Sequence, residues 1–298
     1  MPSKPLLSII IVNYNTADIT VNCLRSIYQD KGLKDIPFEI ILVDNASTDK
    51  SILKIKNFIH SIKIKNFKLK INQTNIGFGA ANNQGLKKAQ GQYILMLNTD
   101  TIILHSAISQ SLNWLSSHPE AGGCTAQLLN KDRSIQPSGG YFPTLLNMCT
   151  LMLHLDDLPF VNAIIKPYHP HTPNFYTHDK YFTTDHSQDW LTGAYILIRQ
   201  EIINKVNGFS PEFFMYGEEM EMCYRIHQTY PQLQFWYLIG PQVIHLGGAS
   251  SPSKQLVFDR EYIGIQKFFQ IHKSLIQQKI VNILISINRF LQSILKHA

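Results

Sequence analysis

The residues best placed to do chemistry in this chain come directly after a short apolar run. Tyr93–Leu97 has the composition of a buried strand, and Asn98, Thr99 and Asp100 follow it at once. In an open α/β sheet, ligands bind beyond the carboxyl ends of the strands. A carboxylate at that edge can hold a divalent cation, and the cation can in turn hold a phosphate. The alternative is that Asp100 caps a helix that begins near Leu104.

Two earlier apolar runs end in the same way. Leu6–Asn13 ends in an amide, and Phe38–Val43 is followed by the carboxylate of Asp44. Helical patterns separate these runs, which predicts βαβ units and a parallel sheet. Because parallel strands share one carboxyl edge, we expect Asn13, Asp44 and Asp100 to form one polar ligand site.

A second group of candidates lies later in the chain. Glu218 and Glu219 follow the largely aromatic and apolar stretch Phe213–Gly217. A carboxyl group held beside such residues tends to have a raised pKa and can accept a proton. His245 ends a further strand pattern and, together with Asp100, would complete a cation site. Mixed nitrogen and oxygen ligands suit Mn²⁺ better than Ca²⁺.

The motifs of other nucleotide-binding classes are missing or incomplete. The P-loop pattern does not occur in the sequence. Gly77-Phe78-Gly79 begins like a dinucleotide fingerprint, but the third glycine position is Asn82, which argues against a dehydrogenase. A nucleotidyltransferase would need a glycine-rich basic loop near the start of the chain, and Ile9–Ala17 contains no Gly, Lys or Arg.

Length and composition describe a globular protein. The 298 residues are 44% hydrophobic and 16% charged, enough for one large α/β domain or two smaller ones. No apolar run is long enough to span a membrane, and we expect no secretory signal at the start of the chain. The four cysteines form no CxxC pair, which favours reduced thiols in the cytoplasm.

The net positive charge and the C-terminal segment of the chain indicate which partners the protein could bind. Much of the formal charge of +6 comes from lysines between positions 50 and 70, which either form a solvated face or attract an anionic membrane. No base-reading motif accompanies them, so we expect no nucleic-acid partner. From Gln255 onward the pattern is helical and amphipathic, with Lys296 among its basic residues. Such a tail packs on the core or on a second subunit, as in a homodimer, or lies on the inner face of the cytoplasmic membrane.

Pro137–Asp189 interrupts the strand and helix pattern, with one helical patch expected within it. Long irregular segments in compact domains are usually binding loops or lids. The histidines His169, His171, His178 and His186 follow no metal-ligand spacing, so we expect them on the surface of loops.

Seven segments, in this order and spacing, resemble family 2 glycosyltransferases of the GT-A fold, and the rhamnosyltransferase-type members in particular. They are Ser8–Asn15, Val43–Asp49, Asn75–Phe78, Leu97–Asp100, Trp190–Ala194, Phe213–Arg225 and His245–Gly248. The resemblance implies an α/β, GT-A type nucleotide-diphospho-sugar transferase fold with a mostly parallel central sheet flanked by helices. It implies a catalytic domain over 1–250, divided into a nucleotide-binding half (1–130) and an acceptor-binding half (131–250), and an amphipathic helical extension over 251–298.

The resemblance also implies roles for individual residues. The nucleotide would lie against Asn13, Asn15, Asp44, Asn45, Ser47, Asn75, Gly77, Phe78, Asn98 and Thr99. The acceptor side would be lined by Trp190, Thr192 and Gly193. Asp100 and His245 would bind Mn²⁺ or Mg²⁺. Glu218 and Glu219 align with the family's catalytic acidic pair, whose second member is the base.

Two positions depart from the family pattern. Glu219 stands where Asp is usual, so either the backbone is adjusted or Glu218 is the base. Asn98 begins the metal motif where Asp is usual, so the motif carries one full charge instead of two. The implied function is an inverting glycosyltransferase of cell-surface polysaccharide synthesis. It would move a sugar, with rhamnose as the candidate, from a nucleoside-diphosphate donor to a hydroxyl of a glycan or lipid-linked glycan. The alternative is a catalytically silent nucleotide-sugar-binding protein with the same fold.

Overall fold

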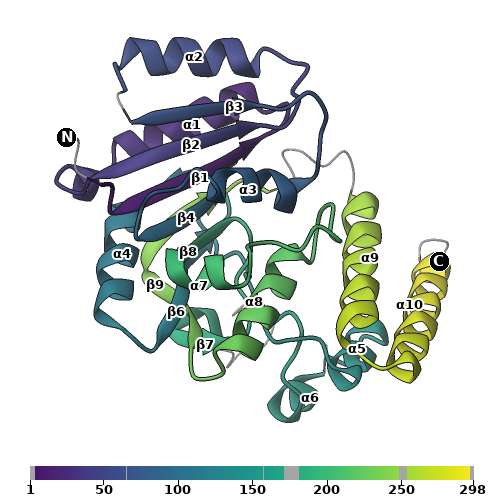
Figure 1. Cartoon of the computed structure of the whole chain (residues 1–298). Coiled ribbons are helices and arrows are strands. Elements are labelled where there is room, and N and C mark those ends of the chain that lie inside the picture. Colours follow the sequence, from purple (N-terminus) through teal and green to yellow (C-terminus); the bar gives the residue numbers. More distant parts are fainter. Residues whose placement is uncertain (1–3, 65, 157, 171–180, 248–253, 296–298) are drawn as a thin grey trace.

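The computed structural model describes residues 4–64, 66–156, 158–170, 181–247 and 254–295 (Figure 1). Its first part contains β1 (Leu7–Asn13), α1 (Ala17–Tyr28), η1 (Lys31–Leu33), β2 (Phe38–Asp44), α2 (Ser51–Ser61), β3 (Phe67–Ile71), α3 (Phe78–Leu86), β4 (Tyr93–Asn98), β5 (Thr101–Ile103), α4 (Ala107–Ser117) and β6 (Ala121–Leu129). The remainder contains α5 (Leu145–Met152), α6 (Pro159–Ile164), η2 (Tyr181–Thr183), β7 (His186–Gln188), β8 (Tyr195–Arg199), α7 (Gln200–Lys205), α8 (Glu218–Thr229), β9 (Gln234–His245), α9 (Lys254–His272) and α10 (Leu275–Leu295). The expected α/β class, with helices flanking a central sheet, is confirmed.

The strands form one sheet in the order β3-β2-β1-β4-β8-β6-β9-β5, and β7 pairs with β9. β3, β2, β1 and β4 run parallel to one another, as predicted, and so do β6 and β9. The other four pairs are antiparallel, so the expectation of a mostly parallel sheet is wrong for the second half. An apolar run does not encode strand direction. Only a helical crossover imposes the parallel arrangement, and β8 follows an irregular segment instead.

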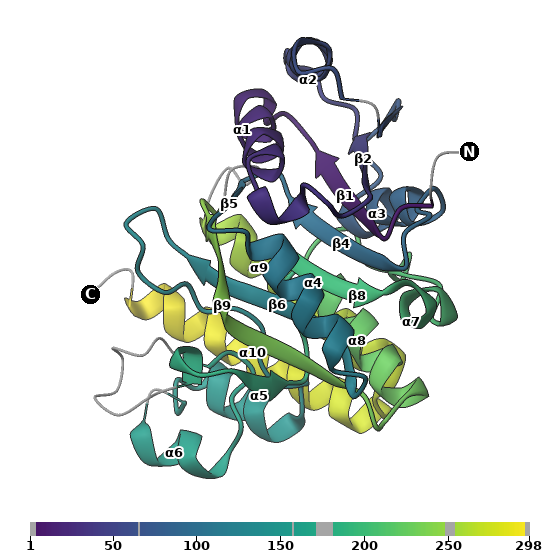
Figure 2. The same cartoon turned by 90° about the vertical axis from the view of Figure 1, so that its left-hand side faces the viewer.

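Both faces of the sheet are covered, which explains why its strands are apolar without alternation. Ile9 and Ile11 of β1 lie in a buried cluster with residues of α1 and α4. Ile10, between them in sequence, lies in a second cluster with residues of α8, α9 and α10. Figure 2 shows α4 and α1 on the near side of the strands and α8, α9 and α10 beyond them.

The polar sheet edge is present as predicted. Asn13 lies opposite Asp44 in the β1–β2 register, and Asn98 lies opposite Val12 on the other side of β1. The alternative role of Asp100 as a helix cap is excluded, because Ser106 is the N-cap of α4. Asp100 instead occupies the turn between β4 and β5.

The middle region differs from the prediction in two ways. The strand expected from Trp190 to Ile198 begins only at Tyr195, because the backbone turns after Thr192 and the Tyr195 N–H donates to the Thr192 carbonyl at 3.4 Å. The described residues of Pro137–Asp189 contain the α-helices α5 and α6, the short 3₁₀ helix η2 and strand β7 instead of one helical patch. His186 is half-buried and stacks on Tyr237, so the expectation of a surface loop position is wrong for it. His171 and His178 lie outside the described residues.

The helical tail is confirmed by α9 and α10, which lie side by side in Figure 1. Val281, Leu284 and Ile285 of α10 are buried, and the Asn288 amide donates to the Met152 carbonyl at 2.7 Å. One face of the tail therefore packs on the core, which was one of the three arrangements expected from the sequence. The predicted boundary at residue 250 lies outside the described residues. So do Gly248, Ser250 and Lys296.

Two expectations from composition also have an outcome. All four cysteines are free thiols. Within the described ranges, no helix is both long enough and apolar enough to cross a bilayer.

Candidate active site

A cavity of ≈ 190 Å³ opens at the polar edge of the sheet. It is lined by Val12, Phe78, Asn98, Thr99, Asp100, Thr192, Gly193, Ala194, Met215, Tyr216, Glu218, Glu219 and His245. Nine of these were predicted as site residues from the sequence. Met215 and Tyr216 were missed, although they belong to the recognised segment that precedes the acidic pair. The cavity thus combines both groups of candidates, which are far apart in the chain.

Asp100 and His245 meet because β5 pairs with β9, which places Thr101 opposite His245. His245 Nε2 lies 3.3 Å from Asp100 Oδ1. The other ring nitrogen, Nδ1, lies 2.6 Å from the side-chain oxygen of Gln136. Because that oxygen can only accept, Nδ1 donates to it, which leaves Nε2 as the ring nitrogen that faces Asp100 and could bind a cation. Sequence reasoning missed Gln136, and no spacing or motif could have indicated it.

This pair fits a divalent cation. Mg²⁺ is commonly held by one or two protein groups together with substrate phosphates, and Mn²⁺ accepts both oxygen and imidazole. No group of three or more His, Cys, Asp or Glu that could hold a metal occurs in the part of the chain that the structure describes. Phosphate or water oxygens would therefore have to complete the coordination. The side-chain oxygen of Asn98, which lines the same cavity, is buried without a hydrogen-bond partner.

The two carboxyl groups at the start of α8 differ in environment. Glu218 is only 2% exposed, and burial together with the neighbouring Glu219 holds its pKa well above the usual range. Glu219 keeps partial exposure, and burial raises its pKa as well. The Gly193 N–H donates to Glu219 Oε1 at 3.3 Å, whereas Oε2 is buried without a partner. Glu218 Oε2 is likewise buried without a partner, but Glu219 keeps partial exposure, so Glu219 is the better placed to receive a proton in the cavity.

Asn13 and Asp44 are fully buried and do not line the cavity. The fully buried Asn13 amide donates to Asp44 Oδ2 at 2.6 Å and to the Ser47 hydroxyl at 2.9 Å. The Asn13 oxygen accepts from the hydroxyls of Thr16 and Thr20. Asn13 thus fixes the direction of the Asp44 carboxylate and has no capacity left for a ligand.

Asn45 plays a similar supporting part on the next segment. Its amide donates to Asn75 Oδ1 at 2.8 Å, and its oxygen accepts from the Ile76 N–H at 3.2 Å. The loop that it holds leads to Gly77, which has a φ of +88°. A Cβ atom there would lie 2.5 Å from the Phe214 carbonyl oxygen, so only glycine allows this approach.

Asn15 and Phe78 complete the nucleotide-side candidates. Asn15 is exposed, and its side-chain oxygen accepts from the Thr48 N–H at 2.8 Å, which closes the turn after β2. Phe78 lines the cavity, and its N–H donates to the Phe214 carbonyl at 2.9 Å. Of the ten predicted nucleotide residues, only Phe78, Asn98 and Thr99 line the cavity itself.

The three predicted acceptor residues do not all line the cavity. Thr192 and Gly193 line the cavity. Trp190 is 5% exposed, its indole N–H donates to the Tyr141 carbonyl at 3.2 Å, and its ring stacks on Tyr168. Trp190 therefore supports the segment that carries Gly193 and does not face the cavity.

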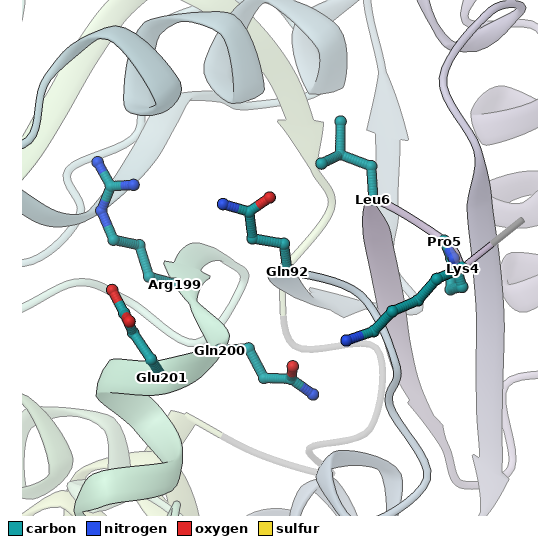
Figure 3. Close-up of a pocket in the computed structure, with 7 residues that line it drawn as sticks. All are labelled: Lys4, Pro5, Leu6, Gln92, Arg199, Gln200 and Glu201. Carbon is teal, nitrogen blue, oxygen red and sulfur yellow. The ribbon is translucent and has the colours of Figure 1, made fainter.

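A larger hollow of ≈ 440 Å³ lies at the opposite edge of the sheet, beside the starts of β1 and β4 (Figure 3). The guanidinium of Arg199, the most basic group there, donates to the backbone carbonyls of Leu115, His118 and Ala121. Gln200 likewise donates to the Ala89 carbonyl. Because these polar groups are used within the fold, the hollow offers less to a ligand than the smaller cavity.

Comparison with known proteins places this geometry in context. The sequence matches the family model described as Glycosyl transferase family 2 over residues 8–220. It is 42% identical over 118 residues to an uncharacterized glycosyltransferase of Haemophilus influenzae, covering 38% of this chain and 43% of that protein. The N-acetylglucosaminyl-diphospho-decaprenol L-rhamnosyltransferase of Mycobacterium tuberculosis is 23% identical over 203 residues, 64% of this chain and 61% of that protein. The chain thus spans less than two thirds of both relatives. Rhamnosyltransferase WbbL of Escherichia coli K12 is 25% identical over 229 residues, 74% of this chain and 76% of that protein.

Solved structures share the fold. The mannosyltransferase PcManGT from Pyrobaculum calidifontis, in complex with GDP-Man and Mn²⁺, has a TM-score of 0.60 at 14% identity and covers 100% of this chain and 76% of that chain. GalNAc-T7 with UDP, GalNAc and Mn²⁺ has a TM-score of 0.57 at 15% identity, covering 82% of this chain and 43% of that chain. At such identities the similarity concerns the fold alone, and it confirms the GT-A fold expected from the sequence.

Proposed function

Because this chain belongs to glycosyltransferase family 2, we propose that its cavity binds a nucleoside-diphosphate sugar and transfers the sugar to a hydroxyl of an acceptor. The observation that carries the proposal is the shared lining of one cavity by two different pairs. Asp100 and His245 suit a divalent cation. Glu218 and Glu219 suit proton transfer.

Each pair has a distinct part in the proposed reaction. Asp100 and His245 would hold Mn²⁺ or Mg²⁺, which neutralises charge on a leaving diphosphate when it is bound. Glu219 accepts the proton of the acceptor hydroxyl on Oε2, while the Gly193 N–H holds Oε1. The acceptor oxygen then attacks the anomeric carbon opposite to the leaving group, and the configuration is inverted.

The remaining candidates bind or shape the pocket in this proposal. Phe78, Asn98 and Thr99 contact the donor directly. Asp44 does not line the cavity; its carboxylate, which accepts from the Asn13 amide and the Ser47 N–H, would support the loop against which the nucleotide base lies. The other predicted nucleotide residues, Asn15, Asn45, Ser47, Asn75 and Gly77, set the loops around it.

Substitution of the acidic pair tests the reaction. Glu219→Gln is expected to lower transfer by about 10²-fold or more while nucleotide affinity stays near that of the wild type. Glu218→Gln is the matched control and is expected to retain more activity. If the two variants exchange these behaviours, Glu218 is the base. If labelled donor binds to the wild type but is neither transferred nor hydrolysed, the silent binding protein is the correct description.

The sugar and the acceptor are further proposals. Rhamnose is the first sugar to test, because two of the similar relatives are named rhamnosyltransferases. We propose a glycan or lipid-linked glycan of the cell surface as the acceptor. A thermal-shift panel of nucleotide sugars with and without Mn²⁺ identifies the donor, because a ligand that binds only the folded state raises its stability.

An exposed stripe on α10 supports a partner proposal. The stripe consists of Ile276, Ile280, Ile283, Ile287, Phe290 and Ile294. Its steps of four and three residues are those of a coiled-coil seam, narrower than the apolar face of a membrane-surface helix. Of the two basic residues on this helix, Arg289 already pairs with Asp259, which leaves little charge for anionic lipid. We therefore propose that a second copy of the chain packs on this stripe.

Light scattering tests the second copy. The wild type is expected to have the mass of a dimer, and Ile283→Asp combined with Phe290→Asp that of a monomer. Ile263→Asp, an exposed isoleucine on α9, is the matched control and is expected to stay dimeric. A monomeric wild type that sediments with anionic vesicles would overturn the proposal in favour of a membrane surface.

A further inference from the structure

A histidine–glutamate pair lies near the proposed base. His169 Nε2 and Glu261 Oε1 are 2.5 Å apart, across 92 positions of sequence. His169 lies in a loop with its side chain 42% exposed, as expected, and this ion pair is the feature that the sequence did not indicate. Glu261 lies on α9, beyond the residues that the family model matches.

Aromatic contacts hold the pair beside the segment that carries Gly193. The His169 ring centroid lies 5.5 Å from that of Trp190 and 4.3 Å from that of Tyr168. Trp190 begins the segment whose Gly193 N–H donates to Glu219. The pair therefore abuts the same structural element that orients the proposed base.

Helix α9 is fixed on α8 and on the loop before it. His272 Nε2 lies 3.1 Å from Glu221 Oε1 of α8. Gly264 packs so closely on the loop that an added Cβ atom would overlap the Tyr216 carbonyl oxygen. Glu261 stands one helical turn before Gly264, so its position relative to Glu218 and Glu219 is fixed by backbone contacts.

The members of the pair act on Glu219 with opposite signs. Burial is the main cause of the raised pKa of Glu219; among its neighbours, the Glu261 carboxylate raises that pKa further and the His169 imidazole lowers it. Among the described residues, the other titratable groups that act on or face Glu219 are Glu218, Tyr168 and Cys223.

We propose that His169 and Glu261 are positioning residues of the catalytic site. Glu261 holds His169 against the Trp190 segment, and His169 in turn keeps the Glu261 carboxylate from acting on Glu219 unopposed. This inference rests on the proposed function, since it assigns Glu219 as the base. It makes α9 part of the catalytic machinery.

The test is a double-mutant cycle read as a pH profile. In His169→Gln, the unpaired Glu261 carboxylate remains. The acidic limb of the pH profile of kcat/KM should therefore shift to higher pH by about one unit. In His169→Gln with Glu261→Gln, both charges are gone and the limb should return toward that of the wild type. His186→Gln, in the same region but stacked on Tyr237, is the matched control and should leave the limb in place. A purely structural role would make the double variant at least as impaired as the single one, and this result would overturn the proposal.

A second measurement does not depend on catalysis. The carboxyl ¹³C shift of Glu219, assigned with Glu219→Gln, gives its titration directly in the full-length protein. It should titrate at higher pH in His169→Gln and at or below the wild-type pH in Glu261→Gln. Unchanged titration in both variants would overturn the inference even in a protein that transfers no sugar. The expected shifts in a protein without transfer would refute only the proposed function.

Discussion

Gln136 offers a sharp test of the cation site, because it touches the cavity only through His245. Its side-chain oxygen accepts from His245 Nδ1 at 2.6 Å, and its amide donates to Asn130 Oδ1 at 3.0 Å. Gln136→Leu has a similar volume but no acceptor. Without that acceptor, a neutral imidazole can carry its proton on Nε2, the nitrogen that faces Asp100, and then has no lone pair there for a cation.

The expected magnitude follows from the role of such partners in known metal sites. Loss of the hydrogen bond behind a metal-binding histidine typically costs 10- to 100-fold in metal affinity. A tenfold loss corresponds to about 1.4 kcal/mol of binding free energy. Gln136→Glu keeps an acceptor at the same place and is expected to restore affinity to the wild-type range.

Calorimetric titration of the nucleotide at several Mn²⁺ concentrations measures this effect. The Mn²⁺ midpoint should rise 10- to 100-fold in Gln136→Leu, and nucleotide affinity without the metal should not change. Thermal unfolding of each variant serves as the control for folding. An unchanged Mn²⁺ midpoint in a folded Gln136→Leu protein would refute the argument that His245 is a cation ligand oriented from behind.

Three further predictions concern stability. Asn13→Ala should lower the free energy of unfolding by about 3 kcal/mol in urea titrations, because the buried Asp44 carboxylate loses its 2.6 Å donor. Gly77→Ala should lower the Tm, because the residue needs a φ of +88° and its Cβ would meet the Phe214 carbonyl. The raised pKa of Glu218 means that its contribution to stability is lost as the pH rises above the usual value of 4.5. The Tm of Glu218→Gln should therefore exceed that of the wild type by an amount that grows with pH, and a constant difference would contradict this reasoning.

The parallel strands of the first half and the polar edge could be predicted because they depend on local pattern. Each buried strand reads as an apolar run, and a run that ends in Asn13, Asp44 or Asp100 marks the edge where ligands bind. Strand direction in the second half could not be predicted, since β8 and β5 reverse through connections without a helical pattern.

The supporting partners of the site could not be predicted either. Asn45 was assigned to the nucleotide, but in the structure its amide is used by the loop around Asn75. A sequence does not distinguish an amide that meets a ligand from one that meets the backbone. Gln136 and Glu261 have no motif because their partners, His245 and His169, are about a hundred positions away and meet them only in the folded chain.

The close contact between Gly264 and the Tyr216 backbone sets the minimum size of a working protein. Ile265, Phe268 and Phe269 of α9 are also buried in the core. A chain that ended after β9 would therefore expose the apolar core surface that these residues cover, and the loop before Glu218 would lose its contact with α9. The segment that the family model matches, residues 8–220, is thus shorter than the piece that must be expressed to study the protein. Boundaries for crystallisation or for domain exchange therefore belong after α10, whose Val281, Leu284 and Ile285 are also buried, and not at the end of the recognisable motif.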